Sequence, residues 1–143
     1  NHIYQIIKKY SALSNKIIIE ISEYHLKSRF TEFVPIINEL REHGFRILVD
    51  KVGQYIVNAA YLKQCHISYV KLHRSIVLDI NLKPDNQMFV QSMKVLCEPL
   101  GIKLFAVGIE SIEEWQTLIK LGICGGQGHY FNEPVAQFAN ATH

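Results

Sequence analysis

The stretch Phe45-Arg46-Ile47-Leu48-Val49-Asp50 decides the fold of this chain. It is an apolar run that closes on an acid, which predicts a β-strand. A helix-period segment precedes it, with Thr31 as its expected N-cap and His43-Gly44 at its end. Further upstream, residues 16–22 are continuous and β-branched, as in a strand buried on both faces. Strand, helix and strand in this order predict a βα unit of a parallel sheet.

The rest of the chain repeats this alternation. Further strands are expected at residues 67–72, 103–107 and 127–131. A helix is expected after Pro84-Asp85, and another where Ser111 and Glu114 have the spacing of a capping box. The fold class is therefore α/β, with about five mainly parallel strands alternating with helices.

Length and composition set limits on function. The chain has 143 residues, of which 48% are hydrophobic and 20% charged, and this suits one ordinary domain. Its net charge of +2 is too mild to predict nucleic-acid binding. Three widely spaced cysteines without a CxxC motif fit reduced thiols in a cytoplasm. No apolar run approaches the roughly 18 residues of a membrane span. Because the start lacks a Met and a signal peptide, we expect a piece of a longer protein.

One polar side chain stands at or near the carboxyl end of each expected strand. In a (β/α)8 barrel, residues at these ends build the active site. Core packing does not explain such a series. The candidate site residues are Glu20, Asp50, Lys71, Glu110 and Gln127.

The order of motifs resembles that of EAL domains. Residues 19–23 resemble the family's Glu-(Ile/Leu)-Thr-Glu strand, and residues 40–53 resemble the segment that ends in Asp-Asp-Phe-Gly. Residues 61–75 resemble its Tyr-(Ile/Val)-Lys segment, and residues 106–111 stand where Ala-Glu-Gly-Val-Glu-Thr belongs. Residues 122–134 match its closing Gln-Gly segment and the proline that follows. The resemblance implies that residues 1–143 are the C-terminal half of one EAL domain, a TIM-like (β/α)8 barrel whose N-terminal half is absent here.

EAL domains hydrolyse cyclic di-GMP with two divalent metals, Mg²⁺ or Mn²⁺. The resemblance implies that Glu20, Asp50 and Glu110 derive from groups around the metals. It also implies that Lys71 corresponds to a lysine beside the attacking water, and Gln127 to a further active-site group. Such chemistry needs several anionic oxygens around hard cations.

Three positions depart from the family pattern. Lys51 replaces the second aspartate, Val107 replaces the first glutamate of Glu-Gly-Val-Glu, and His73 replaces an acid after the lysine strand. The loop at residues 54–58 also lacks the family's glycine and serines. Lys51 places a positive charge where a divalent cation should bind. Two like charges at ~4 Å repel each other by about 4 kcal/mol at an effective dielectric constant of about 20. We therefore expect no bound metal or cofactor and no phosphodiesterase activity.

Several residues allow a structural interpretation beside the functional one. We interpret Lys51 as a surface lysine, with a pair to Glu20 or Asp50 as the alternative. Lys71 is either a remnant of the former active site that neighbouring acids stabilise, or a residue that contacts a phosphate. Gly125-Gly126-Gln127-Gly128 is either a tight turn or a phosphate cradle. The histidines lack the spacing of metal ligands.

Further segments, at residues 72–77, 85–92, 114–119 and 125–128, resemble the CsrD/MshH family of RNase E specificity factors. That family comprises membrane-anchored proteins with degenerate GGDEF and EAL domains, which make Csr-type small RNAs susceptible to RNase E. The resemblance implies a cytoplasmic domain of a protein anchored in the inner membrane. It also implies an interaction with the glucose-specific IIA phosphotransferase protein.

Other functions stay open at this stage. The chain could be a receptor that binds cyclic di-GMP without cutting it, or an active phosphodiesterase. Direct RNA binding has little support, since the charge is mild and no stacking-aromatic motif is present. Half a barrel also has two open sheet edges, so we expect this piece to form a homodimer through them or to be cut from a complete barrel.

Overall fold

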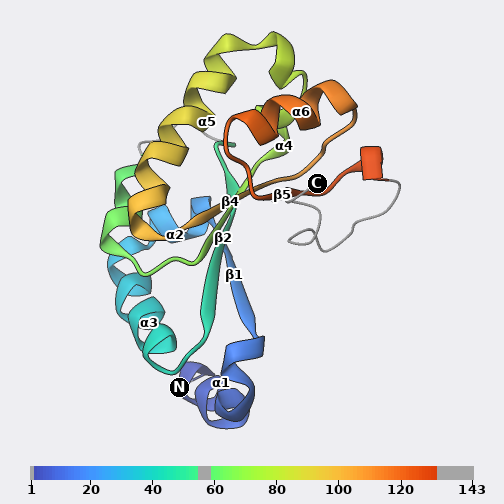
Figure 1. The fold of residues 1–143 in the computed structure, drawn as a ribbon. Helices are drawn as coiled ribbons and strands as arrows, with labels where there is room; N and C mark the ends of the chain where they lie inside the picture. The colour runs from blue at the N-terminus through green and yellow to red at the C-terminus, as the bar shows by residue number, and fades with distance from the viewer. Residues whose placement is uncertain (1, 55–58, 132–143) are drawn as a thin grey trace.

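One five-stranded sheet organises the molecule, whose computed structural model describes residues 2–54 and 59–131 (Figure 1). The strand order is β1-β2-β3-β4-β5, and every neighbouring pair is parallel. This confirms the α/β class and the predicted parallel strands. The strands are β1 (Ile18–Ser22), β2 (Arg46–Val52), β3 (Tyr69–Leu72), β4 (Lys103–Ala106) and β5 (Gly125–Gly126).

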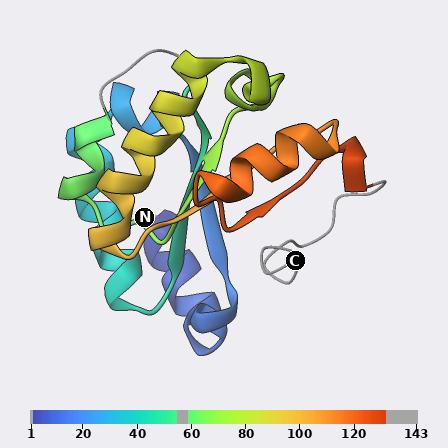
Figure 2. The same ribbon diagram turned by 45° about the horizontal axis from the view of Figure 1, so that its top comes forward.

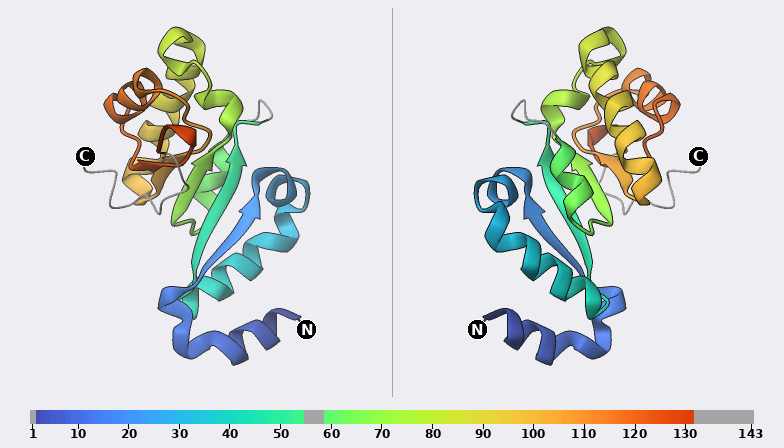
Figure 3. Two further views of the ribbon diagram at one scale, coloured as in Figure 1. Left: turned by 90° about the vertical axis from the view of Figure 1, so that its right-hand side faces the viewer. Right: turned by 90° about the vertical axis from the view of Figure 1, so that its left-hand side faces the viewer.

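Helical segments make the crossovers that parallel strands need. The segments α3, η2 and α5 stand side by side on one face of the sheet (Figures 2 and 3). The α-helices are α1 (His2–Tyr10), α2 (Glu23–Ser28), α3 (Phe30–Glu42), α4 (Arg74–Val77), α5 (Pro84–Cys97) and α6 (Ile112–Lys120). The 3-10 segments are η1 (Ser11–Lys16), η2 (Ala59–Gln64), η3 (Ile80–Leu82), η4 (Glu98–Leu100) and η5 (His129–Phe131).

The two faces of the sheet differ in burial because side chains alternate along each strand. On the helix-covered face, Val49, Val70 and Ala106 are fully buried in the main core. The other face carries no helix over β1 and β2 (Figure 3). Its apolar part is a small cluster of Leu48, Tyr69 and Phe105. The polar candidates on β1, β2 and β3 alternate with the core residues, so the open face carries them.

Helix ends follow the sequence signals in two places and depart from them in others. Ser111 and Glu114 form the predicted capping box of α6, and His43 with Gly44 ends α3 as expected. The prediction of Thr31 as N-cap is wrong, because α3 begins at Phe30 after a separate short helix, α2. That helix is capped by Ser22, whose side chain accepts the His25 N–H. Pro35 consequently lies inside α3 and not in its first turn.

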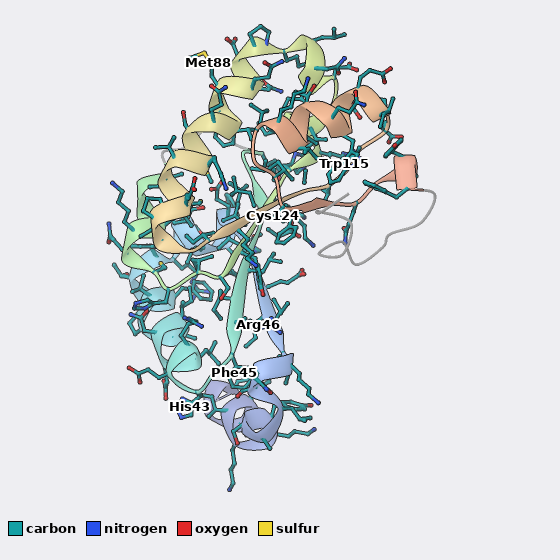
Figure 4. All side chains as sticks on the ribbon, viewed as in Figure 1. His43, Phe45, Arg46, Met88, Trp115 and Cys124 are labelled. Atoms are coloured by element: carbon teal, nitrogen blue, oxygen red, sulfur yellow. The ribbon has the colours of Figure 1, made fainter. Side chains whose placement is uncertain are left out.

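The last strand is shorter and earlier than predicted. Residues 127–131 were expected to form it, but β5 ends at Gly126 and residues 129–131 form η5. The cause is close packing against the loop after β4. A Cβ on Gly128 would lie 2.2 Å from the Ile109 oxygen, and Gly128 has a φ of +152°. Trp115 projects from α6 toward this strand (Figure 4), and its ring contacts that of Phe131.

All three cysteines are free, with Cys65 and Cys97 buried. Burial raises the pKa of the Cys97 thiol to about 11. In the part of the chain that the structure describes, no helix is long and apolar enough to cross a membrane.

Candidate functional site

Three of the predicted site residues gather on the open face of the sheet. Glu20 lies on β1 and Lys71 on β3, and β2 with Asp50 runs between them. The Lys71 Nζ atom lies 3.5 Å from Glu20 Oε1, and the lysine side chain is only 17% exposed. The register places Glu20 level with Leu48 and Leu48 level with Tyr69. Lys71 lies two positions beyond Tyr69 on the same face of the sheet, so its side chain reaches Glu20 diagonally across β2. An acid therefore holds Lys71, and this pair fits the first of the two interpretations of Lys71.

Asp50 and Lys51 lie near the end of β2, where the pairing of this strand with β3 is irregular between Val49 and Val52. Asp50 Oδ1 accepts the backbone N–H of Lys51 at 2.7 Å. Lys51 has a φ of +57°, in the left-handed region that non-glycine residues rarely adopt. Its side chain is exposed, and no ion pair joins it to a carboxylate within residues 2–54 and 59–131. The surface interpretation of Lys51 fits this geometry, because Glu20 pairs with Lys71 instead.

His73 and Val107 follow the next two strands. His73 is the N-cap of α4, and its Nδ1 accepts the Ser75 N–H at 3.1 Å. Burial lowers the pKa of His73, Arg74 and Lys51 lower it further, and Asp50 acts in the opposite direction. Val107 directly follows β4 and brings no oxygen ligand to the site.

Glu110 and Gln127 lie in a second group. Glu110 stands four residues beyond the end of β4, and its Oε2 lies 3.2 Å from Nδ1 of the exposed His129. Gln127 follows β5 and extends the pairing by its backbone, which donates to Ala106 and accepts from Ile109. Glu110 therefore lies near the carboxyl end of β4, in the loop that follows this strand.

Two carboxylates of this site make contacts within the chain. Here one oxygen of Glu20 faces an ammonium group and one oxygen of Asp50 faces a backbone N–H. Among the residues that the structure describes, no three His, Cys, Asp or Glu side chains are grouped closely enough to hold a metal ion.

Two buried glutamates were missed as site residues. Glu23 is 3% exposed and accepts hydrogen bonds from the Gly53 N–H at 3.2 Å and from the Tyr61 hydroxyl. Burial raises the pKa of Tyr61, and the Glu23 carboxylate raises it further. Glu23 is the second glutamate of the Glu-(Ile/Leu)-Thr-Glu motif, so the signal was present in the sequence. Glu114 was recognised only as part of the capping box.

The glycine-rich segment is explained by packing. A Cβ on Gly126 would lie 2.3 Å from Ile109 Cδ1 and 3.0 Å from the Trp115 ring. No room exists for a side chain, which favours the tight-turn interpretation over a phosphate cradle. Two predicted features lie outside the described residues. They are residues 55–58 of the loop that lacks the family's glycine and serines, and Pro134.

A groove of about 620 Å³ runs along β1 and the adjacent helices. Its apolar wall includes Ile21, Phe33 and Ile36, and its polar end carries Glu20 and Lys51. Since β1 is an outer strand of the sheet, this groove lies at one of the two sheet edges.

Comparison with known proteins identifies the family. The sequence model of the EAL domain family matches residues 1–134 of this chain. The chain belongs to the EAL family. This EAL chain is 34% identical over 116 residues to the RNase E specificity factor CsrD of Escherichia coli (strain K12), covering 81% of this chain and 18% of that protein. It is 30% identical over 119 residues to the probable cyclic di-GMP phosphodiesterase PdeG of the same organism, covering 83% of this chain and 24% of PdeG. The chain therefore spans about a quarter or less of these relatives.

Solved structures agree with this assignment. The calcium and cyclic-di-GMP complex of Klebsiella pneumoniae BlrP1 has a TM-score of 0.82 and 27% identity, covering 90% of this chain and 33% of BlrP1. The EAL enzyme Bd1971 has a TM-score of 0.78 and 30% identity, covering 92% of this chain and 35% of Bd1971. The predicted EAL barrel fold is thus confirmed, together with the similarity to the CsrD family.

Proposed function

We propose that this chain is part of a catalytically inactive EAL domain in a CsrD-like regulator, where it acts as a protein-interaction module in RNase E-dependent decay of Csr-type small RNAs. Within this proposal the domain lies in the cytoplasm and belongs to a protein anchored in the inner membrane. Its partner is the glucose-specific IIA phosphotransferase protein. The similarity to CsrD supports this choice over other EAL proteins.

The observation that carries inactivity is the position of Lys51. It follows Asp50 directly, where the family pattern has a second aspartate, and an ammonium group there repels a dication. Val107, directly after β4, stands where the family pattern has another carboxylate. Lys71 does not decide the question, because active members of the family also carry this lysine.

Hydrolysis of cyclic di-GMP by the full-length protein tests the proposal. With Mg²⁺ or Mn²⁺ present, we expect no linear product, measured by chromatography, while an active EAL phosphodiesterase serves as positive control. Linear product that depends on the divalent metal would overturn the proposed inactivity.

A second experiment tests the interaction. The purified full-length protein is immobilised and the unphosphorylated IIA protein is offered to it, with the phosphorylated form as the matched comparison. We expect retention of the unphosphorylated form. No binding to the intact EAL domain would contradict the proposed partner without affecting the proposed inactivity.

A non-hydrolysing cyclic-di-GMP receptor is the second candidate function. Structures at 27% and 30% identity, BlrP1 and Bd1971, have been solved with this nucleotide bound. Calorimetry with cyclic di-GMP in the absence and presence of Mn²⁺ separates the two candidates. Binding without hydrolysis would favour the receptor, and no heat of binding would favour the interaction module. Active hydrolysis is the remaining alternative, since PdeG is a relative.

A further inference from the structure

Glu114 does more than cap its own helix. Its carboxylate is 2% exposed and accepts three backbone N–H groups. Oε1 accepts from Glu110 at 2.6 Å and from Ser111 at 3.1 Å. Oε2 accepts from Asp79 at 2.7 Å, 35 residues away along the chain. A capping box requires only the bond to Ser111, so the bond to Asp79 needs another explanation.

The three amides belong to two different connections. Asp79 lies between α4 and η3, in the connection after β3, and has a φ of +55°. Glu110 and Ser111 lie in the connection after β4. The left-handed region is unfavourable for a residue other than glycine, so surrounding contacts must hold Asp79 there. The bond from its N–H to Glu114 is such a contact.

The Glu110 side chain joins a third connection, the one after β5, to these two. Its Oε2 lies 3.2 Å from Nδ1 of His129, which follows β5. Glu114 therefore fixes the backbone of Glu110, whose carboxylate contacts His129 after β5. On the other side, Asp79 adjoins Leu78 and lies close to Leu82, which are 48% and 74% exposed. One buried carboxylate thus links an exposed apolar segment to the Glu110–His129 pair.

We propose that Glu114 is a positioning residue that locks the connections after β3 and β4 into one unit, so that residues 78–82 and residues 110–111 open together. Buried acceptors facing several amides are costly to remove, because each amide then lacks a partner. The link does not depend on the proposed function of the domain.

Amide hydrogen exchange on the full chain, resolved to single residues, tests this lock. In Glu114→Ala we expect the amides of Asp79, Glu110 and Ser111 to exchange at least roughly tenfold faster, since a lost hydrogen bond lowers local stability. Glu114→Gln serves where the alanine variant does not fold. The carboxamide keeps one acceptor, and its NH2 group then faces either Asp79 or the Glu110–Ser111 pair.

Two matched variants make the test specific. Glu113→Gln changes the exposed neighbour on the same helix and should leave all three amides at their original rates. Ser111→Ala breaks the bond that Ser111 accepts from the Glu114 N–H, so the Glu114 amide should exchange faster while Asp79 does not. If Asp79 exchanges at its original rate in both Glu114 variants, Glu114 is only a helix cap and the proposal is overturned.

Discussion

Lys51 combines two unusual properties in one position: a left-handed backbone and a cation beside Asp50. The side chain points to solvent, so the backbone N–H, and not the ammonium group, satisfies the aspartate. The left-handed backbone disfavours most side chains at this position, but aspartate is among the residues that tolerate it. The charge at Lys51 is therefore open to reversal without disturbing the core.

Reversing the charge at position 51 and adding a carboxylate at position 107 should restore affinity for a divalent metal. We expect Lys51→Asp combined with Val107→Glu to bind Mn²⁺ at least roughly tenfold more tightly than the original domain, because repulsion of about 4 kcal/mol per charge pair is replaced by attraction. Titration calorimetry on the complete domain measures the change. Lys63→Asp, at an exposed lysine on η2, is the matched control, and equal affinity in both variants would contradict the expectation.

His73 should make the domain less stable in acid. Its pKa is lowered by burial and by Arg74 and Lys51, so the unfolded state binds a proton more readily than the folded state. The stabilising contribution is present above the ordinary histidine pKa of about 6.5 and is lost as the pH falls through the lower folded value.

The variant His73→Asn isolates this effect, since an asparagine oxygen can still accept the Ser75 N–H. Between about pH 7.5 and about pH 5, a window that spans the ordinary pKa of histidine, the urea midpoint should fall less in the variant. An equal fall in both proteins would show that other groups cause the acid sensitivity.

At the scale of elements, Glu23 connects α2 to the turn after β2 and to η2. The Tyr61 hydroxyl and the Gly53 N–H both donate to this buried carboxylate. Tyr61→Phe should lower the free energy of unfolding by about 1–3 kcal/mol, because it leaves a buried acceptor without its donor. Urea unfolding measures the loss. The same substitution at Tyr10, 38% exposed at the end of α1, should change stability by less than about 0.5 kcal/mol.

Gly128 sets the approach of the β5 connection to the loop after β4. Gly128→Ala should destabilise the domain by at least about 2 kcal/mol, since its Cβ would collide with the Ile109 backbone. Gly101→Ala is the control, because its φ is +71° but no atom lies within 4 Å of the added Cβ. That variant should cost only the backbone strain of about 1 kcal/mol. Equal losses would show that strain alone, and not close packing, requires Gly128.

At the scale of the whole molecule, the sheet of this chain has two outer strands and one face that carries no helix over β1 and β2 (Figure 3). β1 and β5 are the outer strands, and the open face carries both the small apolar cluster and the Glu20–Lys71 pair. Unpaired outer strands favour association with another chain. The groove along β1 offers an apolar wall for it.

The 143-residue chain by itself should therefore form a homodimer, measured by size-exclusion chromatography with light scattering. Ile36→Glu places a charge in the wall of the groove and should shift the dimer toward monomer. Glu42→Lys changes an exposed residue of the same helix and should not. A stable monomer of the unaltered chain would contradict the predicted dimer.

Local sequence determined much of this protein. The alternation of apolar runs with helix-period segments predicted the parallel sheet, because strands that alternate with helices form βα units. The apolar run at residues 16–22 predicted a strand buried on both faces, but β1 is only partly buried. The capping box of α6 and the glycine after α3 gave correct helix ends, since these signals act within one turn of helix. The predicted boundary of β5 was wrong because the contact of Gly128 with Ile109, which is distant in the sequence, fixed it. The predicted start of α3 was wrong because the short helix α2, capped by Ser22, precedes it.

The tertiary structure alone decided which polar groups meet. Sequence placed Glu20, Asp50 and Lys71 near one end of the sheet, but only the register brought Lys71 to Glu20 and left Lys51 in solvent. The bonds of Glu114 to Asp79 and of Glu23 to Tyr61 join residues 35 and 38 positions apart. Such pairings depend on how the strands are aligned and how the loops close, and no local pattern records them. The sequence therefore identified the polar residues near the strand ends, and only the tertiary structure determined which partners they contact.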